Sequence, residues 1–424
     1  MRRMATKSKK FTEYRPVALA AGLGSMLGSG IIVGLSATIT VWQQGLGLTN
    51  TQVGIISGAL TFAIAFGSLF GGRFAASVGL VRTFNWTNLF YGIGTLLCVF
   101  AVNFEMLLVG AVIAGITSGC DLPISLTVVS HDAPDNKTSS ELVSFTQVFW
   151  QVGIFISYFC SFLVSRLGGL LGARVVFTIL SLIALLTWGW RTFSTRLQYF
   201  HEAGTARIAS VASQSNVMNS KSAFQALFKS ENRGKLLKFF LAILIFYVGW
   251  NLLANTWGQF QTFMLVKANA SQSLATGYGI VTQLLGLPLV ALYAWIAGSK
   301  YRNAAFSVGS VIMFIAISAM AMGGNLLWVI MGAIFLYGLG SNFSGEALYK
   351  VWTQESFPME IRSSIQGIIN GISRICCALF AFVTPSLVMP AVIKTTMWCF
   401  AALVLVGWVA GLLMIHWQKK YGLE

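Results

Sequence analysis

Four charged side chains lie inside long apolar stretches of this chain: Asp121, Glu346, Lys350 and Arg374. An unpaired charge facing lipid at the bilayer centre costs at least about 2.5–3.5 kcal/mol, so such groups normally face a polar cavity. Desolvation there favours the neutral form of a carboxylate, and a nearby cation opposes this effect. We therefore expect Asp121 or Glu346 to bind and release a proton under the influence of Lys350 or Arg374. The alternative is a purely structural role, in which these groups only stabilise helix packing, as a Glu346–Lys350 pair four residues apart can do.

Amide side chains recur at every fourth position of one apolar stretch, at Asn251, Asn255 and Gln259. This spacing places them on one face of a helix. Amides donate and accept hydrogen bonds, and the neighbouring Trp250 and Trp257 offer flat apolar faces, so the set suits a ring that carries hydroxyl groups. Hydrogen bonds between helices are the alternative use of this row. Weaker members of the same expected binding site are Gln147, Gln151, Gln283 and Asn342.

The elements that must position these residues are membrane-spanning helices. The chain has 424 residues, of which 56% are hydrophobic and only 9% charged, whereas a soluble domain is roughly one quarter charged. A helix needs about 20 apolar residues to cross a bilayer, and the apolar blocks divide into about twelve such segments. We expect helices near residues 17–42, 51–76, 83–102, 105–130, 139–166, 172–191, 235–264, 272–298, 303–323, 325–352, 361–388 and 391–418.

Charge distribution and an internal repeat set the expected organisation. Most of the 28 Lys and Arg residues, Arg82 and Arg191 among them, lie in connections that share one side of the membrane if both termini are cytoplasmic. A shift of 224 residues superposes residues 130–145 on 354–369 and thus indicates two parallel repeats. The expected fold is therefore an all-α integral membrane protein with twelve transmembrane helices in two pseudo-symmetric six-helix halves.

The domains expected from this pattern are a cytoplasmic tail (1–15), a first six-helix bundle (16–191), a cytoplasmic linker (192–234), a second six-helix bundle (235–418) and a cytoplasmic tail (419–424). The formal net charge of +16 reflects membrane topology and does not indicate nucleic-acid binding. The three histidines are scattered, and the six cysteines lack the paired spacing of zinc or disulfide sites. We therefore expect no enzyme activity, no catalytic residues, no metal and no cofactor.

Residues 338–371 contain, in this order, an acidic residue, a Phe-Pro pair, an Arg and a Gly. They are Glu355, Phe357, Pro358, Arg362 and Gly367. In this the segment resembles the sugar porter branch of the major facilitator superfamily. The resemblance implies the major facilitator fold over the whole chain. It also implies that Glu355 and Arg362 act in gating, at the cytoplasmic ends of neighbouring helices.

The first half resembles the same family less closely. Residues 71–83 are similar to the superfamily's Gly-x-x-x-Asp-Arg-x-Gly-Arg-Arg signature, which makes Arg82 a third gating residue. However, Ala76 and Ser77 replace the Asp and the Arg, and His131 stands where the family has an acidic residue. The resemblance therefore implies a weakened latch in the first half, with more of the gating left to the second.

The residues and the resemblance together predict a secondary active transporter. We expect a proton symporter that imports a small hydroxylated solute, such as a sugar or inositol, by alternating access. In this it resembles bacterial inositol-type and related metabolite transporters. The alternative is a symporter of an organic or sugar acid that uses Lys350 and Arg374 as an anion clamp. The expected partners are the solute, a proton and the lipid bilayer, and the chain would act as a monomer in the bacterial inner membrane with both termini cytoplasmic.

Overall fold

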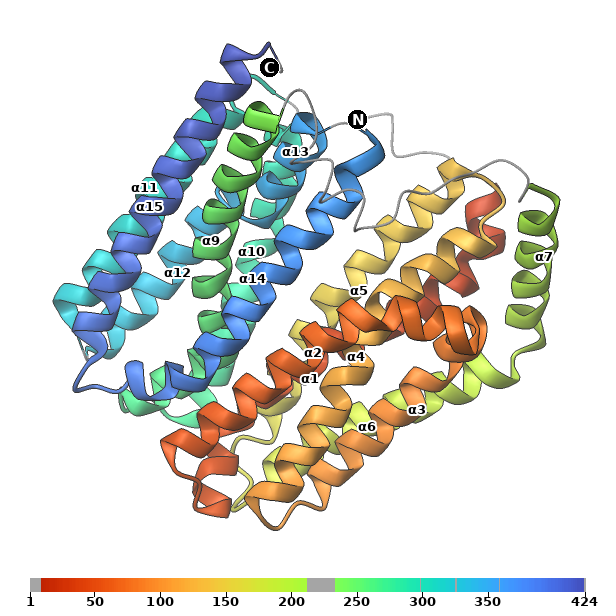
Figure 1. Cartoon of the computed structure of the whole chain (residues 1–424). Helices are drawn as coiled ribbons and strands as arrows, with labels where there is room; N and C mark the ends of the chain where they lie inside the picture. Colours follow the sequence, from red (N-terminus) through yellow and green to blue (C-terminus); the bar gives the residue numbers. More distant parts are fainter. Residues whose placement is uncertain (1–8, 212–232, 298, 325, 358, 423–424) are drawn as a thin grey trace. The chain divides into compact units, whose positions relative to one another are not determined.

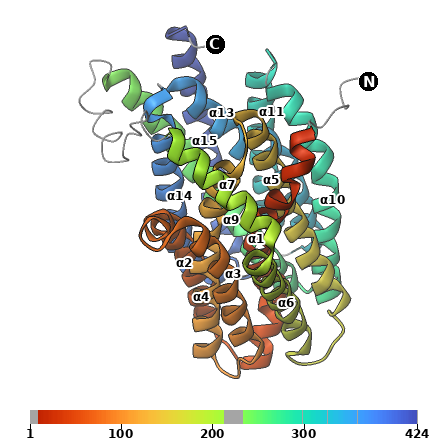
Figure 2. The same ribbon diagram turned by 90° about the vertical axis from the view of Figure 1, so that its right-hand side faces the viewer.

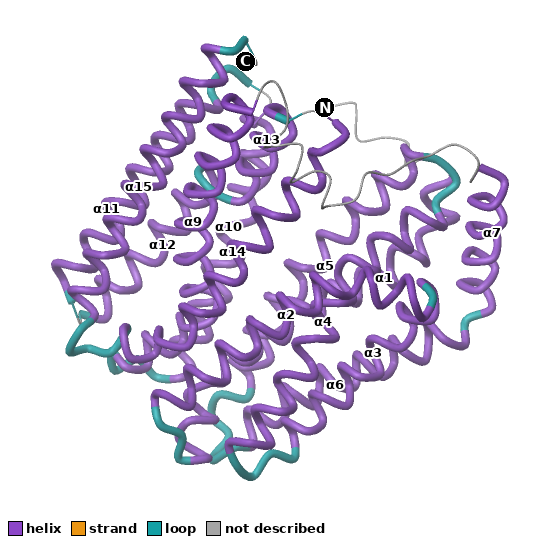
Figure 3. Tube along the Cα trace, viewed as in Figure 1, coloured by secondary structure: helices purple, strands orange, loops and turns teal. Residues whose placement is uncertain are grey.

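The structure is a computed structural model that describes residues 9–211, 233–297, 299–324, 326–357 and 359–422. The regular secondary structure of these residues is helical throughout (Figure 3). The chain divides into two compact units, Met1–Ser215 and Asn216–Glu424, each of which is a bundle of helices (Figure 1). The predicted all-α class is confirmed.

Unit 1 contains seven helices within its described residues. They are α1 (Lys9–Leu46), α2 (Asn50–Val78), α3 (Leu80–Val99), α4 (Phe104–Asp132), α5 (Asn136–Leu163), α6 (Leu171–Phe193) and α7 (Thr195–Val211). Local signals set their ends: Thr49 and Gln52 form a capping box at the start of α2, and Asn103 caps α4. Gly79, with a φ of 109°, adopts a conformation that suits glycine, so α3 begins directly after α2.

Helix α7 lies in the segment that the sequence predicts as a polar linker. Two of its apolar side chains, Leu197 and Phe200, are buried in a core that also contains Phe84 and Val129. Polar residues occupy most of the remaining surface of the helix, so its composition resembles that of a linker. Figure 2 shows α7 as a separate helix that follows α6. The connection therefore begins with a docked helix, while residues 212–232 lie outside the described residues.

Unit 2 also contains seven helices within its described residues. They are α9 (Arg233–Lys267), α10 (Gln272–Ala297), α11 (Arg302–Gly323), α12 (Leu327–Phe343), α13 (Glu346–Ser356), α14 (Met359–Leu387) and α15 (Ile393–Lys420). The single helix predicted over 325–352 is thus two helices, because the helical backbone is interrupted at Gly345. A Cβ there would collide with the Ser341 carbonyl oxygen and lie 2.8 Å from Nε1 of Trp250. Broken helices of this kind often line the binding sites of transporters.

Ten described helical segments are long and apolar enough to cross a membrane. The two remaining predicted spans, 83–102 and 272–298, are also helices, α3 and α10. Large apolar side chains face outward from the bundles, for example Leu186 with 73% of its surface exposed and Trp328 with 75%. Such a surface is suited to lipid and unsuited to water.

Close packing inside unit 1 depends on two glycines. A Cβ at Gly67 would collide with the carbonyl oxygen of Ile116, and a Cβ at Gly119 would collide with that of Ile64. Helices α2 and α4 therefore touch backbone to backbone, as small residues allow in membranes. The contact holds α4 firmly in place, and α4 carries Asp121.

Candidate functional site

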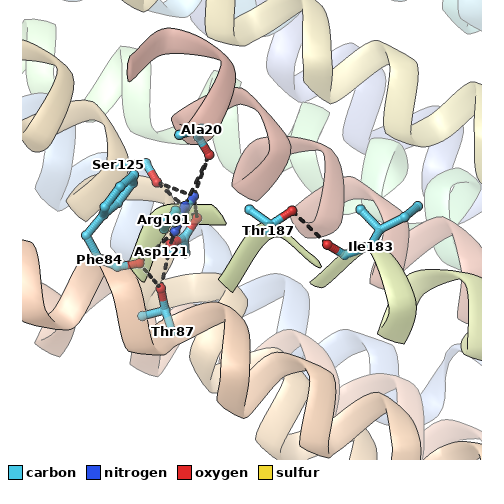
Figure 4. A network of polar contacts seen from close by, with 8 residues as sticks. All are labelled: Ala20, Phe84, Thr87, Asp121, Ser125, Ile183, Thr187 and Arg191. Carbon is cyan, nitrogen blue, oxygen red and sulfur yellow. Dashed lines mark hydrogen bonds and ion pairs between the residues drawn. The ribbon is translucent and has the colours of Figure 1, made fainter. Parts of the chain in front are cut away.

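A buried ion pair lies at the centre of unit 1. Asp121 of α4 accepts from Arg191 of α6, with 2.6 Å between Nη1 and Oδ1 and 3.2 Å between Nη2 and Oδ2 (Figure 4). The side chains are only 0% exposed for Arg191 and 3% for Asp121. The sequence indicated that Asp121 needs a polar environment, but it did not identify Arg191. That residue lies two positions before the end of α6 and is easily assigned to the basic connection that follows.

Other hydrogen bonds complete the surroundings of the carboxylate. The Thr87 hydroxyl donates to Oδ1 of Asp121 at 2.6 Å, and the Ser125 hydroxyl donates to Oδ2 at 3.0 Å. Asp121 therefore has four donors directed at its two oxygens, which suits the charged form of the group.

The guanidinium group is satisfied as fully as the carboxylate. Arg191 donates to the Ala20 carbonyl through Nη2 at 2.8 Å and Nε at 3.2 Å, and to the Phe84 carbonyl through Nη1 at 2.8 Å (Figure 4). Its charge also lies 3.7 Å from the centre of the Phe84 ring, a favourable cation–π position. The network thus joins α1, α3, α4 and α6.

Glycine and proline at neighbouring positions make room for this network. A Cβ at Gly24 of α1 would collide with Oδ2 of Asp121 and lie 2.6 Å from Nη2 of Arg191. Pro123 lacks the N–H that would normally bond the Gly119 carbonyl, and this carbonyl instead accepts from the Ser68 hydroxyl at 3.1 Å. The carbonyl that this proline leaves free therefore links α4 to α2, two residues before Asp121.

A second group of polar and aromatic residues lies in unit 2, where α9, α13 and α14 meet. The Tyr247 ring stacks on Tyr349 at 3.9 Å between centroids and on Trp250 at 5.8 Å. The Tyr247 hydroxyl donates to Asn370 at 3.3 Å, and Asn251 donates to the Ser373 hydroxyl at 2.8 Å. We call Tyr247, Trp250, Asn251, Tyr349 and Asn370 the unit 2 cluster.

Charged groups border the unit 2 cluster. Glu346 and Lys350 form the ion pair that their spacing predicts, at 2.9 Å, with about half of each side chain exposed (51% and 49%). Arg374 of α14 is half-buried and lies four residues after Asn370, on the same face of that helix. The structure therefore brings Trp250, Asn251 and three of the four predicted charged residues together in one unit, whereas Asp121 lies in the other unit with a cation of its own.

The remaining residues of the amide row are placed differently. Gln259 is buried and donates to Asn255 of the same helix at 2.9 Å. Trp257 is buried as well, and it packs edge-on against the rings of Tyr337 and Phe400. Trp257 is therefore a packing residue in this structure, separate from the unit 2 cluster.

The weaker predicted binding residues lie in different parts of the two units. Asn342 donates to the Gly338 carbonyl of its own helix at 2.7 Å. Gln151 in unit 1 and Gln283 in unit 2 are half-buried. The side chain of Gln147 lies outside the described residues.

The predicted gating residues have different surroundings in the two units. Glu355 forms a double hydrogen bond with Arg302, at 2.6 and 2.9 Å, and accepts from Gln418 at 3.3 Å. It therefore ties α13 to the start of α11 and the end of α15. The side chain of Arg362 lies outside the described residues. Arg82 is exposed on α3 and has no acidic partner among the residues that the structure describes.

A second buried carboxylate was not found from the sequence. Asp132, which is fully buried, contacts Nδ1 of His131 at 2.7 Å and Nδ1 of His201 at 2.5 Å. Arg207 adds hydrogen bonds to the carbonyl groups of Ala133 and Asp132. These contacts attach α7 to the end of α4. The adjacent His131 and Asp132 were the only signal, since their partners are about 70 residues away.

Comparison with known proteins gives consistent results. The family model of the Major Facilitator Superfamily matches residues 18–381. The chain is 30% identical over 377 residues to the minor myo-inositol transporter IolF of Bacillus subtilis, covering 87% of this chain and 83% of that one. It is 25% identical to the niacin transporter NiaP of Acinetobacter baylyi, covering 83% and 82%. A solved D-xylose-proton symporter has the same fold, with a TM-score of 0.74 at 16% identity over 94% of this chain and 96% of that one.

Proposed function

The chain belongs to the major facilitator superfamily and is a multi-pass membrane transporter, and from this premise we propose that it imports a small hydroxylated solute, a sugar or a polyol such as inositol. The unit 2 cluster is the observation that carries the proposal, because it combines flat aromatic faces with amides. Hydroxyl groups require both donors and acceptors, and a ring requires an apolar surface. A relative of this chain is named as a myo-inositol transporter.

Each member of the unit 2 cluster has a proposed role in binding. Trp250, which is half-buried, offers a ring face, and the buried rings of Tyr247 and Tyr349 support it by stacking. Asn251 exchanges its bond with Ser373 for bonds to solute hydroxyls. The half-exposed Glu346–Lys350 pair binds hydroxyls at the border. Alternating access then follows from movement of the two halves about the bound solute.

We propose proton coupling through the Asp121–Arg191 pair. Because four donors stabilise Asp121 as an anion, a proton can be taken up only as Arg191 turns away. Protonation is thereby linked to a rearrangement between α4 and α6. Glu346 is the second proposed proton site, since water can reach it directly. A solved structure with the same fold is named as a proton symporter.

An Asp121→Asn variant tests the proton role in proteoliposomes with an imposed pH gradient. We expect it to lose uphill uptake of labelled myo-inositol and to retain exchange of labelled for unlabelled solute, since exchange needs no net proton movement. Glu202→Gln, which changes an exposed carboxylate of α7, is the matched control, and Glu346→Gln tests the second proposed proton site in parallel. Full uphill uptake by Asp121→Asn would remove Asp121 from the coupling mechanism and leave Glu346 as its site.

A second proposed function, transport of an organic or sugar acid, rests on Arg374. This side chain is half-buried and has no acidic partner among the described residues, whereas Glu346 already neutralises Lys350. A relative is named as a niacin transporter, and niacin carries a carboxylate. Competition of labelled myo-inositol uptake by hexoses, polyols and sugar acids separates the two functions. Strong competition by acids alone, with none by polyols, would favour the clamp.

Gating and location complete the proposal. Glu355 is proposed to release Arg302 or Gln418 during alternating access, with Arg362 acting beside it. Arg82 has no comparable acidic partner in the described part of unit 1, so its gating role is the weakest of the three. We further propose that the chain acts as a monomer in the bacterial inner membrane, with both termini cytoplasmic, because this orientation satisfies the positive-inside rule.

A further inference from the structure

Unit 1 has a groove of about 620 Å³ on its surface, between α2, α3 and α4. Its volume falls within the range of roughly 300–1,000 Å³ typical of small-molecule sites. Aromatic side chains dominate its lining, in particular Phe66, Phe70, Phe74, Trp86 and Phe90, each between 42% and 54% exposed. We call this feature the aromatic groove.

One end of the aromatic groove is basic. Arg82 lines it directly, and the Arg73 guanidinium lies 5.9 Å from the centre of the Phe70 ring. Both residues are close to Gly79, where α2 passes into α3 and where a helix in a membrane reaches the bilayer surface. None of the described residues that line the groove is acidic. The groove thus combines a long apolar body with an uncompensated positive end.

The positive charge at this end is uncompensated within the described part of unit 1. The 224-residue repeat places His131 opposite Glu355, which neutralises Arg302 in unit 2, and His131 is already engaged with Asp132. Arg73 and Arg82 are exposed and have no acidic partner among the described residues, so they remain available for an anion from outside the chain.

We propose that the aromatic groove binds one anionic phospholipid, with an acyl chain along the aromatic residues and the phosphate group at Arg73 and Arg82. An acyl chain gains little from leaving a bilayer that is equally apolar, so the headgroup must provide the selectivity. Basic pockets between membrane helices bind anionic headgroups in this way. Each arginine near the surface is expected to favour an anionic over a zwitterionic lipid about fivefold.

Trp86 provides a probe inside the aromatic groove, since 43% of its surface is exposed there. Phospholipids with brominated acyl chains quench tryptophan fluorescence on contact. The full chain is reconstituted in phosphatidylcholine vesicles that contain a small fraction of brominated phosphatidylglycerol or, in parallel, of brominated phosphatidylcholine. Subtracting the signal of a Trp86→Phe variant isolates Trp86, and Trp328→Phe isolates an exposed control tryptophan on α12.

We expect brominated phosphatidylglycerol to quench Trp86 at least about fivefold more effectively than brominated phosphatidylcholine. A chain with both Arg73→Gln and Arg82→Gln should lose this preference, whereas Arg166→Gln, which removes an exposed charge elsewhere in unit 1, should keep it. Trp328 should show no preference. These three arginines are exposed, so none of the substitutions removes a core contact.

Three results would overturn the proposal. The first is equal quenching of Trp86 by the two lipids, and the second is a preference that persists without Arg73 and Arg82. The third is loss of the preference when inorganic phosphate replaces chloride at the same ionic strength, because the basic end would then bind free phosphate. A preference that Trp328 shares would assign the effect to the overall charge of the protein and would equally contradict a site in the aromatic groove.

Discussion

Replacing Arg191 with Met should destabilise unit 1 severely. Asp121 would then be a buried anion whose only remaining partners in the network are the hydroxyls of Thr87 and Ser125. Removal of one partner from a buried ion pair typically costs about 3–5 kcal/mol. For a unit of this size each kcal/mol lowers Tm by about 2–4 °C. We therefore expect Tm to fall by about 6–20 °C.

Asp121→Asn should cost less, about 1–3 kcal/mol. Arg191 keeps its hydrogen bonds to the carbonyls of Ala20 and Phe84. It also keeps its cation–π contact with the Phe84 ring, at 3.7 Å from the ring centre. The double substitution of Asp121 by Leu and Arg191 by Met removes both charges together. It should therefore be less destabilising than Arg191→Met alone.

The assay is thermal unfolding of the purified chain in detergent, followed with a thiol-reactive dye that reports exposure of buried cysteines such as Cys98. The expected order of Tm loss is Arg191→Met, then Asp121→Asn, with the double variant less affected than Arg191→Met. If the Tm of Arg191→Met is as high as that of the double variant or higher, Asp121 does not become an uncompensated buried anion when Arg191 is removed. The reasoning from the ion pair would then be refuted.

Two further predictions follow from contacts in unit 1. Gly24→Ala should lower Tm in the same assay by about 2–12 °C, because its Cβ would collide with Asp121. A Tm equal to that of the parent would show that α1 does not close over the pair. Asp132→Asn should weaken the attachment of α7 to α4, since it removes the charge shared by His131 and His201. We expect faster proteolysis in residues 195–211 of this variant, with an exposed Glu202→Gln variant as control, and unchanged cleavage would show that the carboxylate does not hold α7.

The membrane helices could be predicted from the sequence because a bilayer imposes a minimum apolar length on each of them. The position of Asp121 within such a segment also indicated that it requires polar partners. The ion pair of Glu346 and Lys350 was predictable because the two residues are four positions apart, which is about one helical turn.

Contacts between distant parts of the chain were not predictable in the same way. Arg191 is 70 residues from Asp121, and its position near a helix end resembles that of a connection residue. The break before α13 lies in the non-helical backbone of Ser344 and Gly345, which hydropathy does not report. Trp257 was predicted to bind solute because it is close to the amide row in the sequence and carries a flat apolar ring, but its indole faces the core rings of Tyr337 and Phe400.

The most direct test of the proposed binding site is myo-inositol counterflow in proteoliposomes, because it requires solute binding but no proton gradient. Asn251→Ala removes an amide of the unit 2 cluster, and Asn342→Ala removes an amide that bonds its own helix. We predict that Asn251→Ala raises the half-saturating concentration about tenfold, equivalent to roughly 1.4 kcal/mol, and that Asn342→Ala leaves it within about twofold. Equal half-saturation in the parent and Asn251→Ala would contradict a solute site at the unit 2 cluster.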